Sequence, residues 1–368
     1  MKKFKKAASL LSFTLAVCLL LAMTAVAGFH YPIFINGELT DLKGDTTNGV
    51  TSIGLRALAE KLGFDVDFVD NQILINDPSD DVTITTLAEN NNGENTNLQK
   101  EFGFSVIIER GDDKILFDTA KAGQFLKNAE ALGIDLSDCN TMVLSHAHYD
   151  HCGGVLDFYN KFGAENKTLF VKNSFFENAD AKYYHDTVGQ KFDFSDGTIG
   201  YFPIGINFSE SDLKNKGVTI EYMDGESIKI ADGITVYGSF TPRMDEKMTY
   251  QLENGQYEID DFDEEVAVAI ETSKGLVIVS GCSHNGIVNI VNNIKAKTGK
   301  DVYAVIGGFH LLDATEEQIQ DTIDLFKTLG VEKIGLSHCT GPKATEMFKA
   351  QLGEQTFVNV TGSVVTIR

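Results

Sequence analysis

Three of the eight histidines of this 368-residue chain and one aspartate lie within six residues of each other: His146, His148, Asp150 and His151. They follow an apolar run over 141–144 that is typical of a buried strand. Alternate positions leaving a strand face the same way, so His146 and His148 can bind one metal ion while Asp150 and His151 reach a second. Without a cation, these crowded imidazoles and the carboxylate would repel one another or lack partners. The cluster therefore predicts a dinuclear metal site.

Three further histidines each follow an apolar run: His284 after 276–280, His310 after 302–306 and His338 after 334–336. A single histidine at a strand end is usually an ordinary polar residue, so these assignments depend on the cluster. Together with it, His284 and His338 are expected to complete the two sets of metal ligands. His310 is expected to be a ligand, a neighbour of the ligands or a proton donor to a leaving group.

Strands and helices alternate through residues 79–368, which are expected to form one domain. Strand patterns cover about 82–87, 105–109 and 114–117, and an amphipathic helix covers about 123–132. A Thr-x-x-Gln capping box at Thr315 opens another helix, which leads to the strand carrying His338. This order predicts a layered α/β domain whose site lies along a sheet edge, and its two strand-rich halves suit two facing sheets. Residues 173–263 are rich in Phe and Tyr, which suits either a substrate pocket or the core of an insertion.

Residues 28–78 are expected to form a separate small α+β domain. Strand patterns cover 31–35, 66–68 and 72–75, and a helix over 52–62 ends before Gly63. This stretch resembles the stalk domain of exported bacterial proteins that is named after the N-terminal domain of copper amine oxidases. The resemblance implies a spacer or a contact with the cell wall, and no copper ligands are present in it.

Residues 1–27 have the pattern of a signal peptide. Four lysines precede a largely apolar stretch, and a small-x-small sequence ending at Ala27 is typical of a cleavage site. The protein is therefore expected to be exported, either secreted or held at the cell surface. The alternative is an uncleaved N-terminal membrane anchor, because the apolar stretch is almost long enough to span a bilayer.

The acidic balance of the chain disfavours nucleic acid binding through a basic surface. The formal charge is −22, and loss of residues 1–27 removes four lysines and no acids, which leaves −26. Three of the four remaining cysteines, Cys152, Cys282 and Cys339, lie within two residues of an expected ligand histidine. Export would favour disulfides, but this placement indicates thiols at or near the metal site.

Beyond the histidine cluster, the segment Leu116-Phe117-Asp118-Thr119 is similar to an element of the metallo-β-lactamase fold, with Ala120 in place of a glycine. The chain thus resembles that family, which implies an αββα sandwich. Further stretches are similar to its group of synthases of a dihydropterin-methyl-ribofuranosylaminobenzene phosphate: 87–90, 241–243, 281–286, 307–311 and 337–341.

The resemblance also implies roles for single residues. Asp118 would support the site without binding metal. The family's usual bridging aspartate falls near Cys282, so His284 is expected as a ligand, and Cys282 as either a soft ligand or a neighbour. Two divalent ions are expected, zinc first, with manganese or iron as alternatives.

The expected activity is hydrolysis of a phosphate ester or another small anionic substrate. Metal ions would lower the pKa of a water molecule and stabilise charge on the substrate. Asp150 would orient or deprotonate that water, His310 or Tyr149 would assist the leaving group, and Arg243 would bind the anion. The alternatives are a dihydropterin-type transferase, an iron or thiol redox or sensing protein, and a wall-binding protein with a vestigial site. Nothing in the sequence indicates an oligomeric state.

Overall fold

The computed structural model describes residues 30–35, 38–47, 50–69, 72–76, 81–186, 199–241 and 249–368. The chain divides into two compact units, Met1–Asp80 and Asp81–Arg368. The expected signal peptide over 1–27 and the expected anion-binding Arg243 lie outside the described residues. No helix in the described part of the chain combines the length and apolar character needed to cross a membrane.

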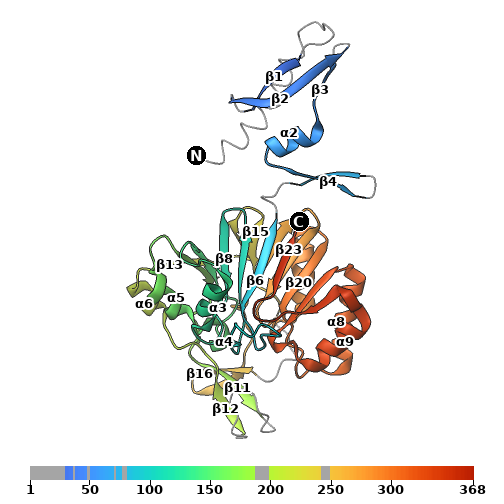
Figure 1. Ribbon diagram of the computed structural model, residues 1–368. Helices are drawn as coiled ribbons and strands as arrows, with labels where there is room; N and C mark the ends of the chain where they lie inside the picture. Colours follow the sequence, from blue (N-terminus) through green and yellow to red (C-terminus); the bar gives the residue numbers. More distant parts are fainter. Residues whose placement is uncertain are drawn as a thin grey trace. The chain divides into compact units, whose positions relative to one another are not determined.

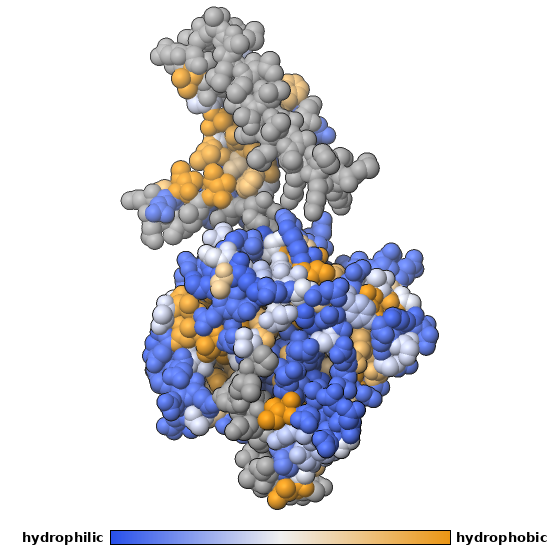
Figure 2. Space-filling model, turned by 180° about the vertical axis from the view of Figure 1, so that it is seen from behind, coloured by the Kyte–Doolittle hydropathy of each residue, from blue (hydrophilic) through white to orange (hydrophobic). Residues whose placement is uncertain are grey.

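The small unit contains two antiparallel sheets and one helix among its described residues. Its elements are β1 (His30–Ile35), β2 (Glu38–Thr47), β3 (Val50–Ser52), α2 (Leu55–Lys61), β4 (Asp65–Val69) and β5 (Gln72–Asn76). Strand β2 was not expected, because its polar sequence lacks the alternation of a half-buried strand. Hydrophobic residues gather on the surface of this unit (Figure 2), and Phe34, Leu39 and Phe68 are exposed. Its resemblance to a stalk domain stays a prediction.

The large unit is built on two seven-stranded sheets, as far as the described residues extend (Figure 1). The first has the order β13 (Thr219–Met223), β10 (Thr168–Lys172), β9 (Thr141–Val143), β8 (Asp113–Phe117), β7 (Ser105–Arg110), β6 (Val82–Ala88) and β23 (Val364–Ile367). The second has the order β14 (Ser227–Ala231), β15 (Ile234–Tyr237), β18 (Ala267–Thr272), β19 (Gly275–Ser280), β20 (Val302–Gly308), β21 (Lys333–Ser337) and β22 (Thr356–Val358).

Helices cover the outer faces of these two sheets. The segments that connect strands of the first sheet contain α3 (Gln124–Leu132), α4 (Tyr149–Cys152), α5 (Val155–Phe162) and α6 (Glu210–Asn215). Those next to the second are α7 (Ile287–Thr298), α8 (Glu316–Leu329) and α9 (Pro342–Leu352), with the short 3₁₀ turns η2 (His338–Thr340) and η3 (Gly353–Gln355).

Three apolar layers hold the sheets and helices together. Strand β7 shows how, because Val106 and Ile108 face the second sheet while Ile107 packs against α3 and α5. A third layer joins the second sheet to α7, α8 and α9. Strands buried on both faces read as continuous apolar runs, which is why the core strands were visible in the sequence. The layers form the expected αββα sandwich, so the predicted fold class is confirmed.

Helix α8 shows how local sequence signals set an element. Thr315 accepts a hydrogen bond from the backbone N–H of Gln318, whose side chain in turn accepts one from the backbone N–H of Thr315. Ile319, Ile323 and Phe326 are buried on one face, and the helix ends at Gly330, whose φ is +67°. The capping box and the apolar face expected from the sequence are both present.

Four strands of the aromatic-rich region form a separate sheet of the large unit. Its order is β12 (Gly200–Pro203), β11 (Lys182–Asp186), β16 (Thr249–Glu253) and β17 (Gln256–Ile259). Rings stack on one another across it: Tyr201 lies 3.7 Å from Tyr257, and His185 lies 4.2 Å from Tyr201, measured between ring centroids. This sheet matters for the site because β11 begins with the buried Lys182.

Candidate metal centre

The expected site residues meet because they follow parallel strands whose carboxyl ends share an edge. Strands β8 and β9 are parallel neighbours, and Asp118 and the 145–152 segment follow them. In the second sheet β19, β20 and β21 are also parallel neighbours. They lead to His284, His310 and His338 respectively. The site therefore lies where the carboxyl ends of strands from both sheets meet.

Three buried imidazoles form the first half of the site. The ring centroids of His146 and His148 are 4.5 Å apart, and His284 lies 4.9 Å from His146 and 4.8 Å from His148. The Nε2 atoms of His146 and His148 and both ring nitrogens of His284 have no hydrogen-bond partner. Buried polar atoms without partners are costly, so this convergence of nitrogens suits a cation.

Asp118 orients two of the histidines. Its Oδ2 atom accepts hydrogen bonds from the Ser145 hydroxyl at 2.7 Å and from His151 Nδ1 at 2.6 Å. The Ser145 oxygen in turn lies 2.8 Å from His146 Nδ1. Both histidines are thus held with Nε2 toward the site, which is how carboxylates position metal-binding imidazoles. Asp118 contacts the ligands from behind, as the family resemblance implied.

Asp150, His151 and His338 form the second half of the site. His338 Nε2 lies 3.1 Å from Asp150 Oδ2, and its Nδ1 lies 3.0 Å from the side-chain oxygen of Asn90. The backbone N–H of His338 donates to Glu89 at 2.6 Å. Glu89 and Asn90 belong to the stretch at 87–90 that carried the family resemblance, and the structure shows what they contact.

Burial sets the protonation of the first half. It is the largest cause that lowers the pKa of His146, His148 and His284 well below the ordinary value, and neighbouring imidazoles act in the same direction on all three. The three rings are therefore neutral at pH 7, as a metal ligand must be.

The second half behaves as an ion pair. Burial favours the neutral form of both partners, yet the hydrogen bond to Asp150 and nearby negative charge raise the pKa of His338 to about 9. Burial raises the pKa of Asp150, but His151 and His338 lower it by more. The pKa of Asp150 therefore lies below its ordinary value. The carboxylate is therefore ionised and can bind a cation, and His338 can bind one only after it releases its proton.

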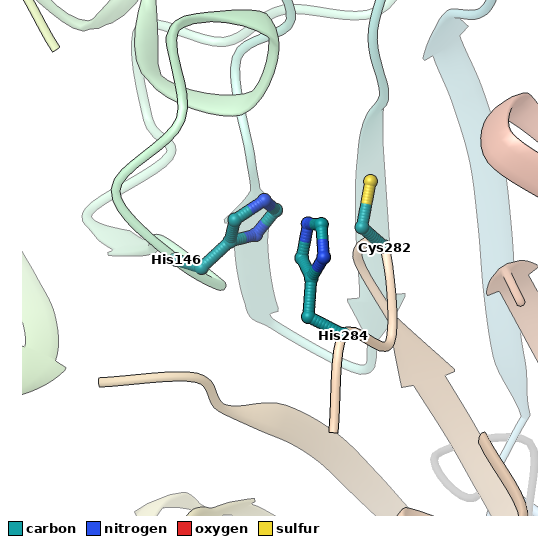
Figure 3. A group of neighbouring side chains, drawn as sticks. All are labelled: His146, Cys282 and His284. Atoms are coloured by element: carbon teal, nitrogen blue, oxygen red, sulfur yellow. The ribbon is translucent and has the colours of Figure 1, made fainter. Parts of the chain in front are cut away.

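Cysteine sulfur atoms lie among the candidate ligands. The sequence left open whether Cys282 is a ligand or a neighbour of the ligands. Within the described part of the chain, there are three groups of potential ligand atoms that lie within 4.8 Å of one another: His146 with Cys282 and His284, His151 with Cys282 and His338, and His310 with Cys282 and Cys339. Cys282 belongs to all three. Figure 3 shows the first group, in which Cys282 and His284 come from one loop and the ring of His284 lies beside the ring of His146.

A buried charge cluster supports the site from the side of the aromatic sheet. The ammonium of Lys182 lies 2.8 Å from carboxylate oxygens of Asp260 and Glu264. It also lies 5.3 Å from the ring centroid of Phe262, which stacks on His284 at 3.9 Å. Sequence reasoning missed this cluster because the lysine and the acids are about eighty positions apart.

Glu265 holds the loop that carries His284. Its two carboxylate oxygens accept the backbone N–H groups of His284 and Asn285, each at 2.7 Å. Burial is the main cause that raises the pKa of Glu265 to about 7, against these hydrogen bonds. An acidic pair directly before the apolar strand β18 was the available signal for Glu264 and Glu265.

Strained backbone is concentrated around the site. Among non-glycine residues, Asp118, Ser283, His310 and His338 have positive φ angles of 59°, 60°, 48° and 49°. Such conformations cost free energy and persist where the surroundings hold them in place. The loops that carry the candidate ligands are thus held in set positions before any ligand binds.

The expected site residues that the structure describes all come together in one region, and Arg243 lies outside the described residues. His146, His151, His284, His310 and His338 contribute to the three ligand groups. His148 and Asp150 stand outside those groups but contact them through the ring of His146 and through His338. Neutral imidazoles, an ionised carboxylate and a thiol form a donor set that fits transition-metal ions, so the residues present fit the expected metal.

Several known proteins are similar to this chain. The sequence model of the metallo-beta-lactamase superfamily matches residues 98–167. A 7,8-dihydropterin-6-methyl-4-(beta-D-ribofuranosyl)-aminobenzene-5'-phosphate synthase of Methanocaldococcus jannaschii is 36% identical over 294 residues, which cover 75% of this chain and 93% of that protein. An uncharacterized protein of the same organism is 30% identical over 260 residues, covering 68% of this chain and 90% of that protein.

Among solved structures, similarity extends to Tm1679, described as a metal-dependent hydrolase of the beta-lactamase superfamily. That structure has a TM-score of 0.63 and 28% sequence identity, and the match covers 77% of this chain and 98% of the other. These matches cover between 68% and 77% of this chain and at least 90% of each relative.

Proposed function

This chain belongs to the metallo-beta-lactamase superfamily, and from that premise we propose that it is a metal-dependent hydrolase acting on a phosphate ester or another small anionic substrate. One observation carries the proposal. The buried nitrogens of His146, His148 and His284 converge without partners, beside an ionised Asp150. This arrangement suits two divalent cations, zinc first and manganese or iron otherwise.

The proposed ligands are His146, His148 and His284 on one side and Asp150, His151 and His338 on the other. When bound, the metal ions would supply a nucleophilic water at neutral pH and stabilise negative charge on the substrate. Asp118 keeps Nε2 of His146 and His151 facing the site. Asp150, as an ionised carboxylate, can orient a water molecule or accept its proton.

Two further residues are proposed to act on the substrate. His310 lies beside the first group of ligands, with its ring centroid 4.3 Å from that of His284, where it can deliver a proton to a leaving group. Arg243 is proposed to bind an anionic group of the substrate, on the strength of its sequence motif.

The test combines metal analysis with an activity screen. The protein purified without oxygen should contain about two equivalents of zinc or manganese, and a His148→Ala/Asp150→Ala variant should lose them. The parent should hydrolyse members of a panel of phosphate monoesters and diesters, and the variant should not. No metal in the parent, or equal activity in the variant, would overturn the proposal.

A second candidate function is a dihydropterin-type synthase. It is favoured by the 36% identity to the Methanocaldococcus jannaschii enzyme over 93% of that protein. Incubation with a dihydropterin activated as its methyl pyrophosphate and an aminobenzene ribofuranosyl phosphate, followed by mass spectrometry for the joined product and an assay for the pyrophosphate released, distinguishes the two. Export argues for hydrolysis, because an exported enzyme would rarely meet activated pterin metabolites.

A third candidate is an iron or thiol redox or sensing protein, favoured by the sulfurs of Cys282 and Cys339 beside the histidines. Two irons in the purified protein and a thiol-dependent spectral change, without hydrolysis, would support it. Zinc or manganese together with hydrolysis would reject it.

We also propose that the protein is exported, by a signal peptide over residues 1–27, and that residues 28–78 contact the cell wall. N-terminal sequencing of protein recovered outside the cell should begin at Gly28. Pull-down with purified wall material, repeated after deletion of residues 29–77, tests the role of the small unit.

A further inference from the structure

We propose that the Cys282 thiolate is a ligand shared by the two metal positions of this site. The inference rests on the proposed function, because it takes the site to hold metal ions. It assigns the sulfur a definite role, and it predicts a metal centre with one soft donor at its middle.

The position of the sulfur carries the proposal. Cys282 Sγ lies within 4.8 Å of ligand atoms of His146 and His284, and within the same limit of ligand atoms of His151 and His338. The two pairs share no other residue in these groups. A donor between two pairs of imidazoles can bind an ion on each side, whereas a donor in only one group cannot.

Ring nitrogens of the neighbouring histidines lie near the sulfur of Cys282. His151 uses Nδ1 for the hydrogen bond to Asp118, so its Nε2 is turned inward and lies 3.1 Å from Cys282 Sγ. On the other side, Nε2 of His146 and both ring nitrogens of His284 are buried and have no partner. The sulfur and these nitrogens are therefore candidate donors to the same ions.

The loop of Cys282 is shaped for this position. A Cβ atom on Gly281 would lie 2.2 Å from the Ser145 oxygen, so only glycine allows the loop to approach Ser145 and Asp118 so closely. Ser283 has a φ of 60° and donates a hydrogen bond to the carbonyl of Gly308 at 2.7 Å. Glu265 holds the next two backbone N–H groups. These contacts hold the residues before and after Cys282 and thereby fix the position of its sulfur.

Cys339 is the competing sulfur, and its geometry differs. Its thiol donates to the backbone carbonyl of Cys282 at 3.4 Å, and it joins only the group with His310. It is also partly exposed, whereas Cys282 is buried. Cys339 therefore fits a neighbour of the metal centre and Cys282 fits the shared ligand.

Cobalt(II) substitution of the full chain tests the assignment. Visible d–d bands report that cobalt is bound, and near-ultraviolet sulfur-to-cobalt charge transfer reports a thiolate ligand. The parent should bind about two cobalt ions with charge-transfer absorption. Cys282→Ser should lose that absorption and bind the second ion at least roughly tenfold more weakly, the lower end of what losing a supporting residue alone costs. Cys282→Asp should restore binding of two ions without the absorption.

Two control variants make the result specific. Cys339→Ser and Cys139→Ser should both keep the charge-transfer absorption. Cys139 is a buried thiol that hydrogen-bonds to the carbonyls of Lys114 and Thr141, away from the histidines. Circular dichroism shows whether each variant is folded. If Cys282→Ser is not folded, Cys282→Asp provides the measurement of metal binding without the thiolate.

The outcomes separate this inference from the function on which it rests. Two cobalt ions bound without charge transfer, or charge transfer lost in Cys339→Ser and kept in Cys282→Ser, would overturn the inference and leave the metal site standing. Failure of the parent to bind cobalt, zinc or manganese would overturn both.

Discussion

Asp118 determines the orientation of two candidate ligands at once, although it is not expected to touch metal. One of its oxygens accepts from Ser145 and from His151, and through Ser145 it also orients His146. A carboxylate can accept all of these hydrogen bonds because it has no proton of its own. Among single residues, the carboxylate that orients the candidate ligands is thus as important for the geometry of the site as the candidate ligands themselves.

Asp118→Asn should weaken metal binding by about 10–100-fold while leaving the protein folded. The other oxygen of Asp118 accepts the backbone N–H of Ser145 at 2.7 Å. An amide has one acceptor oxygen, so it cannot accept this N–H together with the hydroxyl of Ser145 and the ring N–H of His151. Competition with a chromophoric chelator measures the affinity. Asp138→Asn is the control, because that carboxylate is 61% exposed and pairs with Lys114. Unchanged affinity in Asp118→Asn would contradict the orienting role.

Gly281→Ala should lower stability by about 1–3 kcal/mol and weaken metal binding. The added Cβ would meet the Ser145 oxygen at 2.2 Å and its Cβ at 2.7 Å, so the loop carrying Cys282 must move. Gly225→Ala is the matched control, since nothing lies within 4 Å of the position of its Cβ. Urea unfolding and chelator competition measure the two effects, and equal behaviour of the two variants would reject the explanation.

At the scale of elements, the aromatic sheet supports the metal centre through charge. Strand β11 contributes Lys182, and the segment before β18 contributes Asp260 and Glu264. Burial lowers the pKa of Lys182, but the two carboxylates outweigh it and the net shift is upward. The lysine therefore stays charged, and the stack of Lys182, Phe262 and His284 links this sheet to the site.

Lys182→Met should destabilise the protein by about 3–5 kcal/mol, because it leaves two carboxylates buried without their cation. Urea unfolding followed by circular dichroism measures the change. Lys229→Met removes an exposed lysine that pairs with Asp232, and it should change stability by less than about 0.5 kcal/mol. Similar midpoints for the two variants would show that the buried cluster contributes little.

At the scale of the whole molecule, stability should depend on pH through buried carboxyl groups. Burial is the main cause that raises the pKa of Glu101 to about 7, although the backbone N–H groups of Ala122 and Gln124 lower it. A carboxyl with a raised pKa in the folded state stabilises the protein below its unfolded pKa, and that contribution is lost as pH rises.

Glu101→Gln should therefore remove part of this pH dependence. From about pH 4.5 to about pH 7 the parent should lose stability relative to the variant, because only the parent must ionise this partly buried carboxyl group. Below about pH 4.5 the difference should be constant. Urea midpoints measured across pH 4 to 8 test the sign, and a difference that grows toward low pH would contradict it.

Metal binding by the large unit should not depend on the small unit. The division falls between Asp80 and Asp81, and every candidate metal ligand belongs to Asp81–Arg368. Deletion of residues 29–80 should leave the metal stoichiometry of the protein unchanged, as measured by elemental analysis. A loss of metal on deletion would show that the small unit contributes to the site.

The sequence alone predicted a layered α/β domain and most candidate ligands, because buried strands read as apolar runs and the candidate ligands follow directly after them. The αββα sandwich was implied by the family resemblance. The cluster at 146–151 and the histidines at 284, 310 and 338 are local signals of this kind. The polar strand β2 carried no such signal, because its sequence does not alternate.

Only the tertiary structure decided which groups meet across long sequence separations. It brought Cys282 between two pairs of histidines, joined Lys182 to Asp260 and Glu264, and set Asn90 beside His338. Such contacts depend on the crossing of strands from two sheets at a shared edge, and periodicity within a segment carries no information about them.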